Sequence, residues 1–339
     1  MILSCNHISK SYGVDTILDD CSFFVNDGEK AAIVGNNGAG KSTIMKIIMG
    51  ELSADNGTIT LGKNKTIGYL AQYQDLASHN SIYDEVKSVK ADIINMEKKL
   101  VEYEKAMSGV SGDELHKLME NYTNLEHRFQ LLNGYSYKSE IEGVIKGLGF
   151  TEDDFNREVG TLSGGQKTRV ALCKLLLEKP DIIMLDEPTN HLDLEMTEWL
   201  EDFLSHSRVC LLMVTHDRYF LDRVCNRIVE IDSRALYTYK GNYSYYLEKR
   251  QERIEARNAE IDRANNLLRT ELDWMRRQPQ ARGTKAKYRI DAFYELEKKA
   301  RAEKVEENVT LAVKSSYIGS KIFEIKHLHK QFGEKKIIE

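Results

Sequence analysis

A glycine-rich loop near residue 40 limits the fold of this chain more than any other feature. Residues 31–34 form a short apolar run, residues 35–42 read Gly-Asn-Asn-Gly-Ala-Gly-Lys-Ser, and an apolar helical pattern follows as far as Gly50. In such a strand–loop–helix the glycines let backbone amides curl around phosphate oxygens, and the N-terminus of the helix adds a favourable dipole. The loop therefore predicts an α/β domain that binds the phosphates of a nucleotide.

Each position of this loop has an expected role. We expect Lys41 to reach the β- and γ-phosphates and Ser42 to ligate Mg²⁺. A tight turn without a ligand is the alternative, but the strand before the loop and the helix after it favour a phosphate site. The residues predicted to bind ATP here are Gly35, Asn36, Asn37, Gly38, Ala39, Gly40, Lys41, Ser42 and Thr43.

Two acidic residues end a second apolar run, at residues 182–185. A buried strand that ends in paired carboxylates indicates a function for them, because burying charge is unfavourable. We expect Asp186 to hold Mg²⁺, usually through water, and Glu187 to polarise the attacking water. Solvated acids at the end of a strand are the alternative interpretation.

The peptide Leu-Ser-Gly-Gly-Gln at residues 162–166 precedes a predicted helix. It could be a simple helix cap, or a second phosphate-facing helix N-terminus. With the other two motifs in order, the chain resembles the ATP-binding cassette superfamily of P-loop NTPases. The resemblance implies that this peptide is the family's signature, which closes over the γ-phosphate held by the opposite cassette, through Ser163, Gly164, Gly165 and Gln166.

The resemblance assigns four more residues. Tyr12 matches the aromatic residue that stacks on adenine, and Gln72 matches the glutamine that contacts Mg²⁺ and the attacking water. Asp193 lies in the loop that crosses the cassette interface, and His216 matches the switch histidine near the γ-phosphate. The implied cofactors are ATP and Mg²⁺ and the implied activity is ATP hydrolysis, with catalytic residues Glu187, His216 and Gln72 and metal ligands Ser42, Gln72 and Asp186.

Two helical hairpins are predicted around the cassette. Apolar residues three and four apart predict a helical arm inserted at about residues 84–148, with Ser111 and Glu114 as a capping box. A seven-residue apolar repeat follows residue 242 and is typical of a coiled coil, with a second helix expected over residues 288–305. The predicted domains are a cassette at 1–241, a helical hairpin linker at 242–306, and a connector with the first strands of another cassette at 307–339.

The last prediction rests on an internal repeat. Residues 322–333 match residues 2–13 at a constant offset, and Ile337 and Ile338 fall where Ile17 and Leu18 stand. The register predicts that a second cassette begins near residue 321 and that this chain is a truncated piece of a two-cassette protein. In the superfamily each ATP lies between two cassettes. We therefore expect the chain to bind ATP but to hydrolyse it weakly unless two copies pair.

Charge and cysteine content exclude other classes. With a formal net charge of −5, the chain as a whole does not attract nucleic acid. Its five cysteines include no CxxC pair, which argues against a disulfide framework or a zinc site. No signal peptide or apolar stretch long enough to span a membrane is evident, so a cytoplasmic location is expected. An ATPase subunit that docks on separate membrane proteins remains an alternative.

The stretch at residues 274–289 is basic, although the chain as a whole has a negative net charge. It contains six basic residues and no acid, which suits a phosphate backbone, although a solvated loop is the alternative. These residues, at the expected tip of the linker hairpin, are Arg276, Arg277, Arg282, Lys285, Lys287 and Arg289.

The sequence of residues 187–193, Glu-Pro-Thr-Asn-His-Leu-Asp, resembles that of the ABC-F subfamily, and the sequence of the linker tip resembles that of its Uup branch. ABC-F members have two cassettes and no membrane domain, and many act on the ribosome. The resemblance implies a ribosome-associated ATPase whose linker tip approaches tRNA or rRNA. An ATPase acting on branched or single-stranded DNA, and a protein that binds ATP without turnover, are the alternatives.

Overall fold

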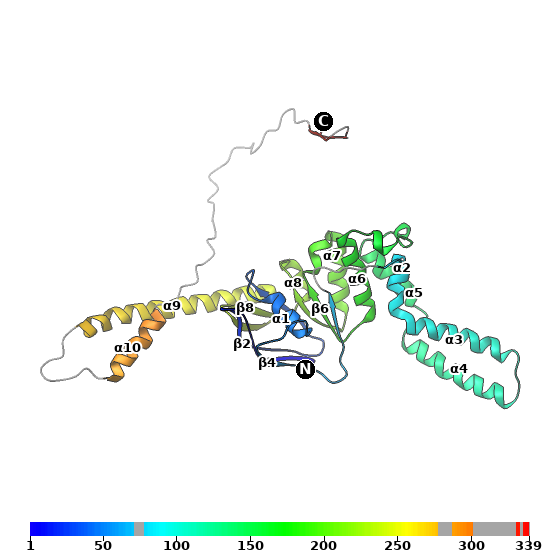
Figure 1. Cartoon of the computed structure of the whole chain (residues 1–339), viewed down its shortest axis with the longest axis horizontal. Helices are drawn as coiled ribbons and strands as arrows, with labels where there is room; N and C mark the ends of the chain where they lie inside the picture. The colour runs from blue at the N-terminus through cyan, green and yellow to red at the C-terminus, as the bar shows by residue number, and fades with distance from the viewer. Residues whose placement is uncertain (71–77, 277–286, 301–329, 333–334, 339) are drawn as a thin grey trace. The chain divides into compact units, whose positions relative to one another are not determined.

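The computed structural model describes residues 1–70, 78–276, 287–300, 330–332 and 335–338 (Figure 1). The chain divides into two compact units, Met1–Gln251 and Glu252–Glu339. The first unit is the α/β domain that the phosphate loop predicts.

A six-stranded sheet lies at the centre of the first unit. The strands follow the order β5-β6-β7-β3-β8-β9, and all neighbours are parallel except β8 and β9. Every residue of β6 and β7 is buried, as expected for parallel strands covered on both faces. The bounds are β5 Ile67–Leu70, β6 Ile182–Asp186, β7 Cys210–Val214, β3 Lys30–Gly35, β8 Arg227–Asp232 and β9 Ala235–Lys240.

One face of this sheet is covered by helix α1 (Lys41–Ile48) and by a second, antiparallel sheet. That sheet has the order β2-β1-β4 and consists of β1 (Leu3–Tyr12), β2 (Asp15–Val25) and β4 (Asn56–Leu61). Strand β1 runs further than its apolar pattern indicates, because pairing with β2 continues to Tyr12. The phosphate loop thus sits between a buried parallel strand and a helix, as predicted.

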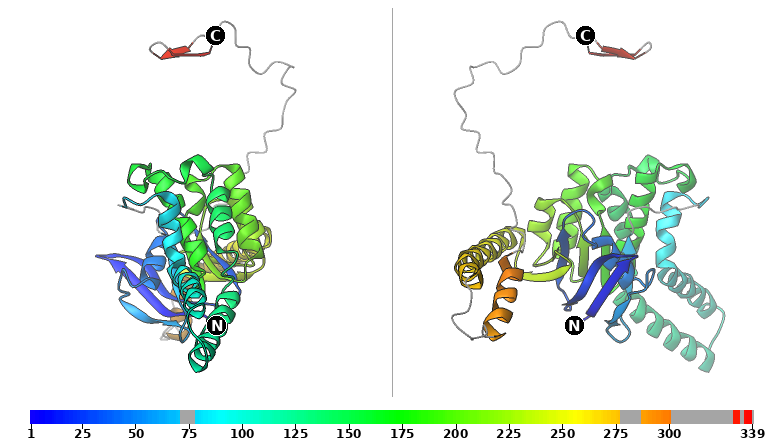
Figure 2. Two further views of the ribbon diagram at one scale, coloured as in Figure 1. Left: turned by 90° about the vertical axis from the view of Figure 1, so that its right-hand side faces the viewer. Right: turned by 60° about the vertical axis from the view of Figure 1, so that its left-hand side comes forward.

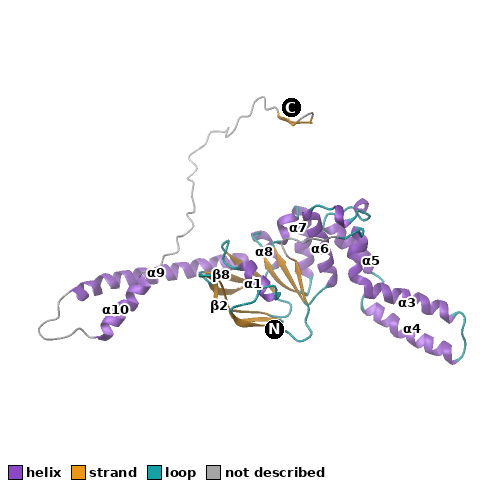
Figure 3. Cartoon of the chain, viewed as in Figure 1, coloured by secondary structure: helices purple, strands orange, loops and turns teal. Residues whose placement is uncertain are grey.

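The other face of the sheet is covered by helices (Figure 3). Alternate residues of β6 point to opposite sides, so Ile183 packs among the helices while Met184 packs toward α1. Short 3₁₀ turns link several of the helices, at Ser88–Lys90, Glu152–Asp154, Val159–Thr161 and Pro188–His191. The helices on this face are α2 Ile82–Lys87, α5 Tyr137–Gly147, α6 Gly164–Glu178, α7 Leu194–His206 and α8 Arg218–Val224.

Helices α3 (Ala91–Met107) and α4 (Asp113–Leu131) form the hairpin of the arm and lie side by side in Figure 2. The predicted capping box is wrong. Helix α4 begins after Gly112, which has φ +68°, and its N-cap makes no side-chain hydrogen bond. Because the turn through Gly112 delays the helix, Ser111 lies one residue outside the cap position and cannot serve it.

Helix α9 (Tyr243–Arg276) begins in the first unit and continues into the second. In the second unit, Ile254 and Ile261 of the heptad pattern are buried. Helix α10 (Lys287–Ala300) lies along α9, since Leu296 lines one hollow with Ile261, Ala264 and Leu267. The predicted continuation of α10 to residue 305 lies outside the described residues.

The strands β10 (Lys330–Phe332) and β11 (Lys335–Ile338) pair antiparallel. Their partners repeat those of β1 and β2 at the same offset as the sequence repeat, including an irregularity after the first pair. Lys330↔Ile338, Gln331↔Lys336 and Phe332↔Lys335 correspond to Lys10↔Leu18, Ser11↔Thr16 and Tyr12↔Asp15. Among the described helices, none combines the length and the apolar character that crossing a membrane requires.

Candidate nucleotide site

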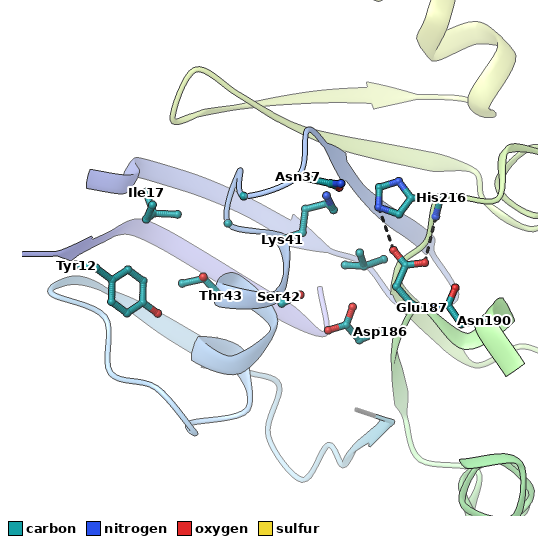
Figure 4. A pocket seen from close by; sticks show the side chains of 13 residues that line it. Tyr12, Ile17, Asn37, Lys41, Ser42, Thr43, Asp186, Glu187, Asn190 and His216 are labelled. Atoms are coloured by element: carbon teal, nitrogen blue, oxygen red, sulfur yellow. Dashed lines mark hydrogen bonds and ion pairs between the residues drawn. The ribbon is translucent and has the colours of Figure 1, made fainter. Parts of the chain in front are cut away.

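A pocket of about 430 Å³ opens at the edge of the sheet where β3, β6 and β7 end (Figure 4). This is the carboxyl edge of the parallel strands, where ligands of open α/β sheets bind. Three lining residues, Ile17, Asn190 and Val214, were not predicted. The predicted residues that line the pocket are Tyr12, Asn37, Gly38, Gly40, Lys41, Ser42, Thr43, Asp186, Glu187 and His216.

Two glycines of the loop, Gly35 and Gly40, have neighbours that exclude a side chain. Gly40 has φ +102°, and a Cβ there would lie 2.7 Å from Cγ2 of Ile17. A Cβ on Gly35 would lie 2.6 Å from the carbonyl oxygen of Ile231 on β8. The loop is therefore packed tightly against two neighbouring strands, which fixes the direction of its amides. Of the residues predicted to bind ATP, Gly35, Asn36 and Ala39 belong to the loop but do not line the pocket.

The Lys41 ammonium lies across the mouth of the loop. It donates to the carbonyl oxygens of Gly35, at 2.9 Å, and Asn36, at 3.1 Å. Burial lowers the pKa of Lys41, while the carboxylates of Glu187 and Asp186 act in the opposite direction. A cation held in this position can attract the phosphate oxygens of a nucleotide.

Asp186 ends β6 deep in the pocket and only 6% of its surface is exposed. Burial raises the pKa of Asp186, opposed by a hydrogen bond with Ser42 and by the charges of Lys46 and Lys41. A hydroxyl and a carboxylate are the hard oxygen ligands that Mg²⁺ prefers. Ser42 and Asp186 therefore fit a magnesium ion, which commonly takes one or two protein ligands beside phosphate and water.

Glu187 follows Asp186 in a strained left-handed conformation, with φ 52°. Its N–H donates to the carbonyl oxygen of Val214 at 2.8 Å, which ties the turn to the end of β7. Such strain concentrates at functional sites. Burial raises the pKa of the Glu187 carboxyl, opposed chiefly by His216.

The turn that carries His216 is itself held in place. The carboxylate of Asp217 accepts the N–H groups of Tyr219 and Phe220, at 3.0 and 3.1 Å, and so caps α8. The N–H of Asp217 donates to the hydroxyl of Thr215 at 3.2 Å. The imidazole of His216 therefore faces the pocket from a fixed turn (Figure 4).

The predicted signature peptide caps α6 and does not line this pocket. The Ser163 hydroxyl accepts the N–H of Gln166 at 3.3 Å, and the Gln166 side chain accepts the N–H of Ser163 at 3.1 Å. A Cβ on Gly165 would lie 3.4 Å from the His191 ring, at ordinary van der Waals contact. Asp193 caps α7 by accepting the N–H of Met196 at 2.9 Å. Ser163, Gly164, Gly165, Gln166 and Asp193 thus lie outside the pocket that Lys41 lines.

The structure describes only part of the predicted linker tip. Gln72 lies outside the described residues, as do Arg277, Arg282 and Lys285 of the linker tip. Arg276 is the last residue of α9, and Lys287 and Arg289 lie in the first turn of α10. Lys287 is exposed.

Sequence profiles described as ABC transporter match residues 18–190 and residues 229–311. The first match covers half of the chain and includes both the phosphate loop and the acids that end β6. This chain belongs to the ABC transporter family of ATP-binding proteins. Members of this family are ATPases, and their cassettes bind ATP.

Curated relatives of this ABC protein are longer than the chain itself. The ATP-binding protein YdiF of Bacillus subtilis is 45% identical over 75% of this chain and 40% of its own length. The ABC transporter ATP-binding protein YfmR of Bacillus subtilis is 36% identical over the whole chain and 53% of its own length. The energy-dependent translational throttle protein EttA of Mycobacterium tuberculosis is 35% identical over the whole chain and 60% of its own length. The chain thus spans about half the length of these relatives.

A solved structure supports the fold. The ATP-binding subunit of an ABC transporter superposes with a TM-score of 0.53 at 18% identity, covering 71% of this chain and 90% of that one. The α/β P-loop fold expected for an ATP-binding cassette is therefore confirmed.

Proposed function

We propose that this chain hydrolyses Mg²⁺–ATP at the pocket between the phosphate loop and His216. The observation that carries the proposal is that Lys41, Asp186, Glu187 and His216 line one pocket at the carboxyl edge of the sheet. Lys41 would hold the β- and γ-phosphates, and Tyr12, half-exposed on the same pocket, would stack on adenine. Mg²⁺, held by Ser42 and Asp186 with Gln72 as a further ligand, would neutralise phosphate charge.

Glu187 would orient the attacking water and accept its proton, and His216 would contact the γ-phosphate. The carboxylate is ordered by two contacts with His216, so little reorganisation is needed before a water binds to it. Catalysis in this scheme is positioning and charge stabilisation, as in other phosphoryl transfers.

The site is proposed to be completed by another cassette. Ser163 and its neighbours lie outside the pocket, so the phosphate-facing end of α6 is available to the nucleotide of a partner cassette. The repeat of the β1–β2 register in β10–β11 supports a second cassette starting near residue 321. In the chain by itself, two copies would have to pair, and turnover per chain should rise with protein concentration.

We further propose that the chain is part of an ABC-F translation factor of the Uup type that binds the ribosome. Support comes from the EttA relatives, whose name describes a translational throttle, and from the helical segment that follows the cassette. The linker tip, with six basic residues and no acid in residues 274–289, would approach tRNA or rRNA. A cytoplasmic location belongs to this proposal.

Co-sedimentation tests the two proposals together. The Glu187→Gln chain, and a two-cassette protein with the matching change in its second cassette, would be incubated with ATP and ribosomes and run on a sucrose gradient. We expect ATP-dependent migration with ribosomes, lost when the six basic tip residues are changed to glutamine. A control changes six surface lysines of the cassette.

Each outcome has a separate meaning. Migration that survives loss of the tip charges would contradict a role for the linker tip. Absence from ribosomes, with association to branched or single-stranded DNA instead, would replace the translation proposal. ATP hydrolysis by the wild type would remain in either case as the test of the pocket.

A further inference from the structure

A buried carboxylate outside the nucleotide pocket connects two segments that are distant in sequence. Glu85 of α2 is 7% exposed. One of its oxygens accepts from the Ser78 hydroxyl at 2.8 Å and from the Asn80 amide at 3.0 Å. Its other oxygen accepts from the ammonium of Lys174, on α6. Glu85 therefore joins residues 78–80 to the helix that carries the predicted signature peptide.

The same residues 78–80 lie beside the segment that enters the signature. The N–H of Val159 donates to the carbonyl oxygen of Asn80 at 3.0 Å, and the N–H of Gly160 to that of Ser78 at 2.9 Å. Ser81 and Glu158 form a bridge of the antiparallel type next to these bonds. The backbone then passes directly from Gly160 to Ser163, the N-cap of α6.

Glu85 is consequently connected to both sides of the signature, directly through Lys174 and indirectly through Ser78 and Asn80. The ladder to residues 158–160 fixes the chain before Ser163, and the ion pair with Lys174 fixes the body of α6 after it. Lys174 lies about three turns along the helix from Ser163, and a helix transmits its orientation over that distance as a rigid rod. A shift at Lys174 or at residues 158–160 would therefore change the direction of the phosphate-facing end of α6.

The electrostatics agree with an ionised link. Hydrogen bonding to Lys174, Ser78 and Asn80 lowers the pKa of Glu85, although burial acts in the opposite direction. A buried ion pair is rarely more stabilising than apolar residues of similar volume. What the ion pair adds at this place is a directional connection between three segments.

We infer that Glu85 is a positioning residue for the signature peptide, acting through Lys174 and residues 78–80. The inference rests on the proposed hydrolysis of ATP between two cassettes. A signature acts on the nucleotide of the partner cassette, so a fault in its position should leave ATP binding at the chain's own phosphate loop intact and lower turnover in the paired state.

The first measurement compares Glu85→Gln with wild type for ATP affinity and for turnover at saturating ATP and high protein concentration. We expect kcat to fall on the order of 10- to 100-fold, as for a small misplacement of a catalytic group, with ATP affinity within about twofold. The matched control is Glu97→Gln. That carboxylate also binds a lysine and a hydroxyl, of Lys138 and Tyr137, but lies at the base of the arm.

Mixing chains separates positioning from general damage to the fold. Glu187→Gln chains keep an intact signature but cannot hydrolyse ATP. In a mixed pair, the Glu85→Gln chain supplies its own phosphate loop and Glu187, and its partner supplies the signature. Half of the pairs in an equal mixture are mixed and each has one competent site, so we expect roughly a quarter of the wild-type rate from two nearly inactive proteins.

A second variant distinguishes a loss of positioning from a loss of stability. Glu85→Gln/Lys174→Met removes both charges and should restore the melting temperature, while turnover stays low and is recovered by the same mixing. Unchanged turnover in Glu85→Gln, loss of ATP affinity, or no recovery on mixing would overturn the inference while leaving the proposed function in place. A wild type that hydrolyses no ATP at any concentration would refute the proposed function, and the inference with it.

Discussion

Nε2 of His216 lies 3.3 Å from Oε1 of Glu187, and the backbone N–H of His216 donates to Oε2 of the same carboxylate at 3.3 Å. Both oxygens of the carboxylate are thus oriented by one residue at the end of the neighbouring strand. The contact joins the turn after β6 to the turn after β7. The acid and the histidine therefore form one unit, and replacing either residue should alter the orientation of the other.

Replacing Glu187 should separate binding from hydrolysis. We expect Glu187→Gln to keep ATP affinity, because Lys41 and the loop amides are unaffected, and to lose about 10²- to 10⁴-fold in kcat as a general base is removed. Nucleotide titration and phosphate release measure the two quantities. Glu195→Gln, at an exposed position of α7, is the control. Turnover of the Glu187→Gln chain close to wild type would exclude the proposed role.

The dependence of turnover on pH should reveal the buried state of Glu187. Burial raises the pKa of this carboxyl above its ordinary value of 4.5, and the carboxylate is the active form. Activity should therefore rise with pH, and the midpoint of this acidic limb in kcat/KM should lie above 4.5. Measurement in buffers of constant ionic strength tests this. A midpoint at or below the ordinary value would show that another group controls the limb.

Asp186→Asn should stabilise the nucleotide-free chain while weakening binding of Mg²⁺–ATP. Since burial raises the pKa of Asp186 in the folded state, its contribution to stability is fully present below its ordinary pKa of 3.8 and is lost as pH rises through the raised value. Asparagine avoids this loss, so the melting temperature of the Asp186→Asn variant should be a few degrees higher than that of the wild type at pH 7. The difference should close as the pH falls. A lower melting temperature at pH 7 would contradict the electrostatic argument.

Two substitutions of Ser163 should distinguish capping from phosphate recognition. Ser163→Ala removes the cap of α6 and should lower the free energy of unfolding by about 1 kcal/mol. Ser163→Asp keeps a cap but places a carboxylate where a phosphate is proposed to bind, so turnover should fall further than in the alanine variant. Urea unfolding and phosphate release measure the two effects. Higher turnover in the aspartate variant would place the phosphate elsewhere.

The start of α9 is anchored to the sheet by a buried acid. Glu230 of β8 is 2% exposed and accepts from Nε of Arg250 at 2.6 Å and from the hydroxyl of Tyr246 at 3.1 Å. Arg250 itself is partly exposed, so Arg250→Met should cost about 1.5–3 kcal/mol, the range for a hydrogen bond between charged groups. Tyr246→Phe removes one hydrogen bond and should cost about 1 kcal/mol. Denaturant unfolding of both variants gives the ranking, and equal losses would contradict the argument that the charge of Arg250 matters.

The parts of the fold that sequence predicted well are those set by local chemistry. The loop before α1 needs glycines at fixed positions, and the strands β6 and β7 are continuous apolar runs, so both have a signal within a few residues. Asn190 could have been found too, since it directly follows the acids and Pro-Thr in the sequence. It lines the pocket because the 3₁₀ turn Pro188–His191 brings it back toward β6.

Other features depend on contacts that no local pattern reports. Glu85 and Lys174 are far apart in the sequence, and each resembles an ordinary surface charge on a helix. Helical periodicity also could not show that α2 and α5 pack beside α6 while α3 and α4 extend away as an arm, with only Ile93, Leu100 and Phe129 of the arm in the core cluster. That division depends on which apolar faces find a partner, as Ile82 and Ile141 do.

The arm leaves and re-enters the domain at neighbouring points. Glu97 of α3 binds Tyr137 and Lys138 of α5, at 2.6 and 2.9 Å, and these bonds close the base of the hairpin. Because the base is closed, whole turns could be added to or removed from α3 and α4 together without disturbing the sheet. The length of the hairpin can thus change during evolution in steps of about 5.4 Å, one helical turn at a time. Related cassettes could differ in how far they reach while keeping one catalytic centre.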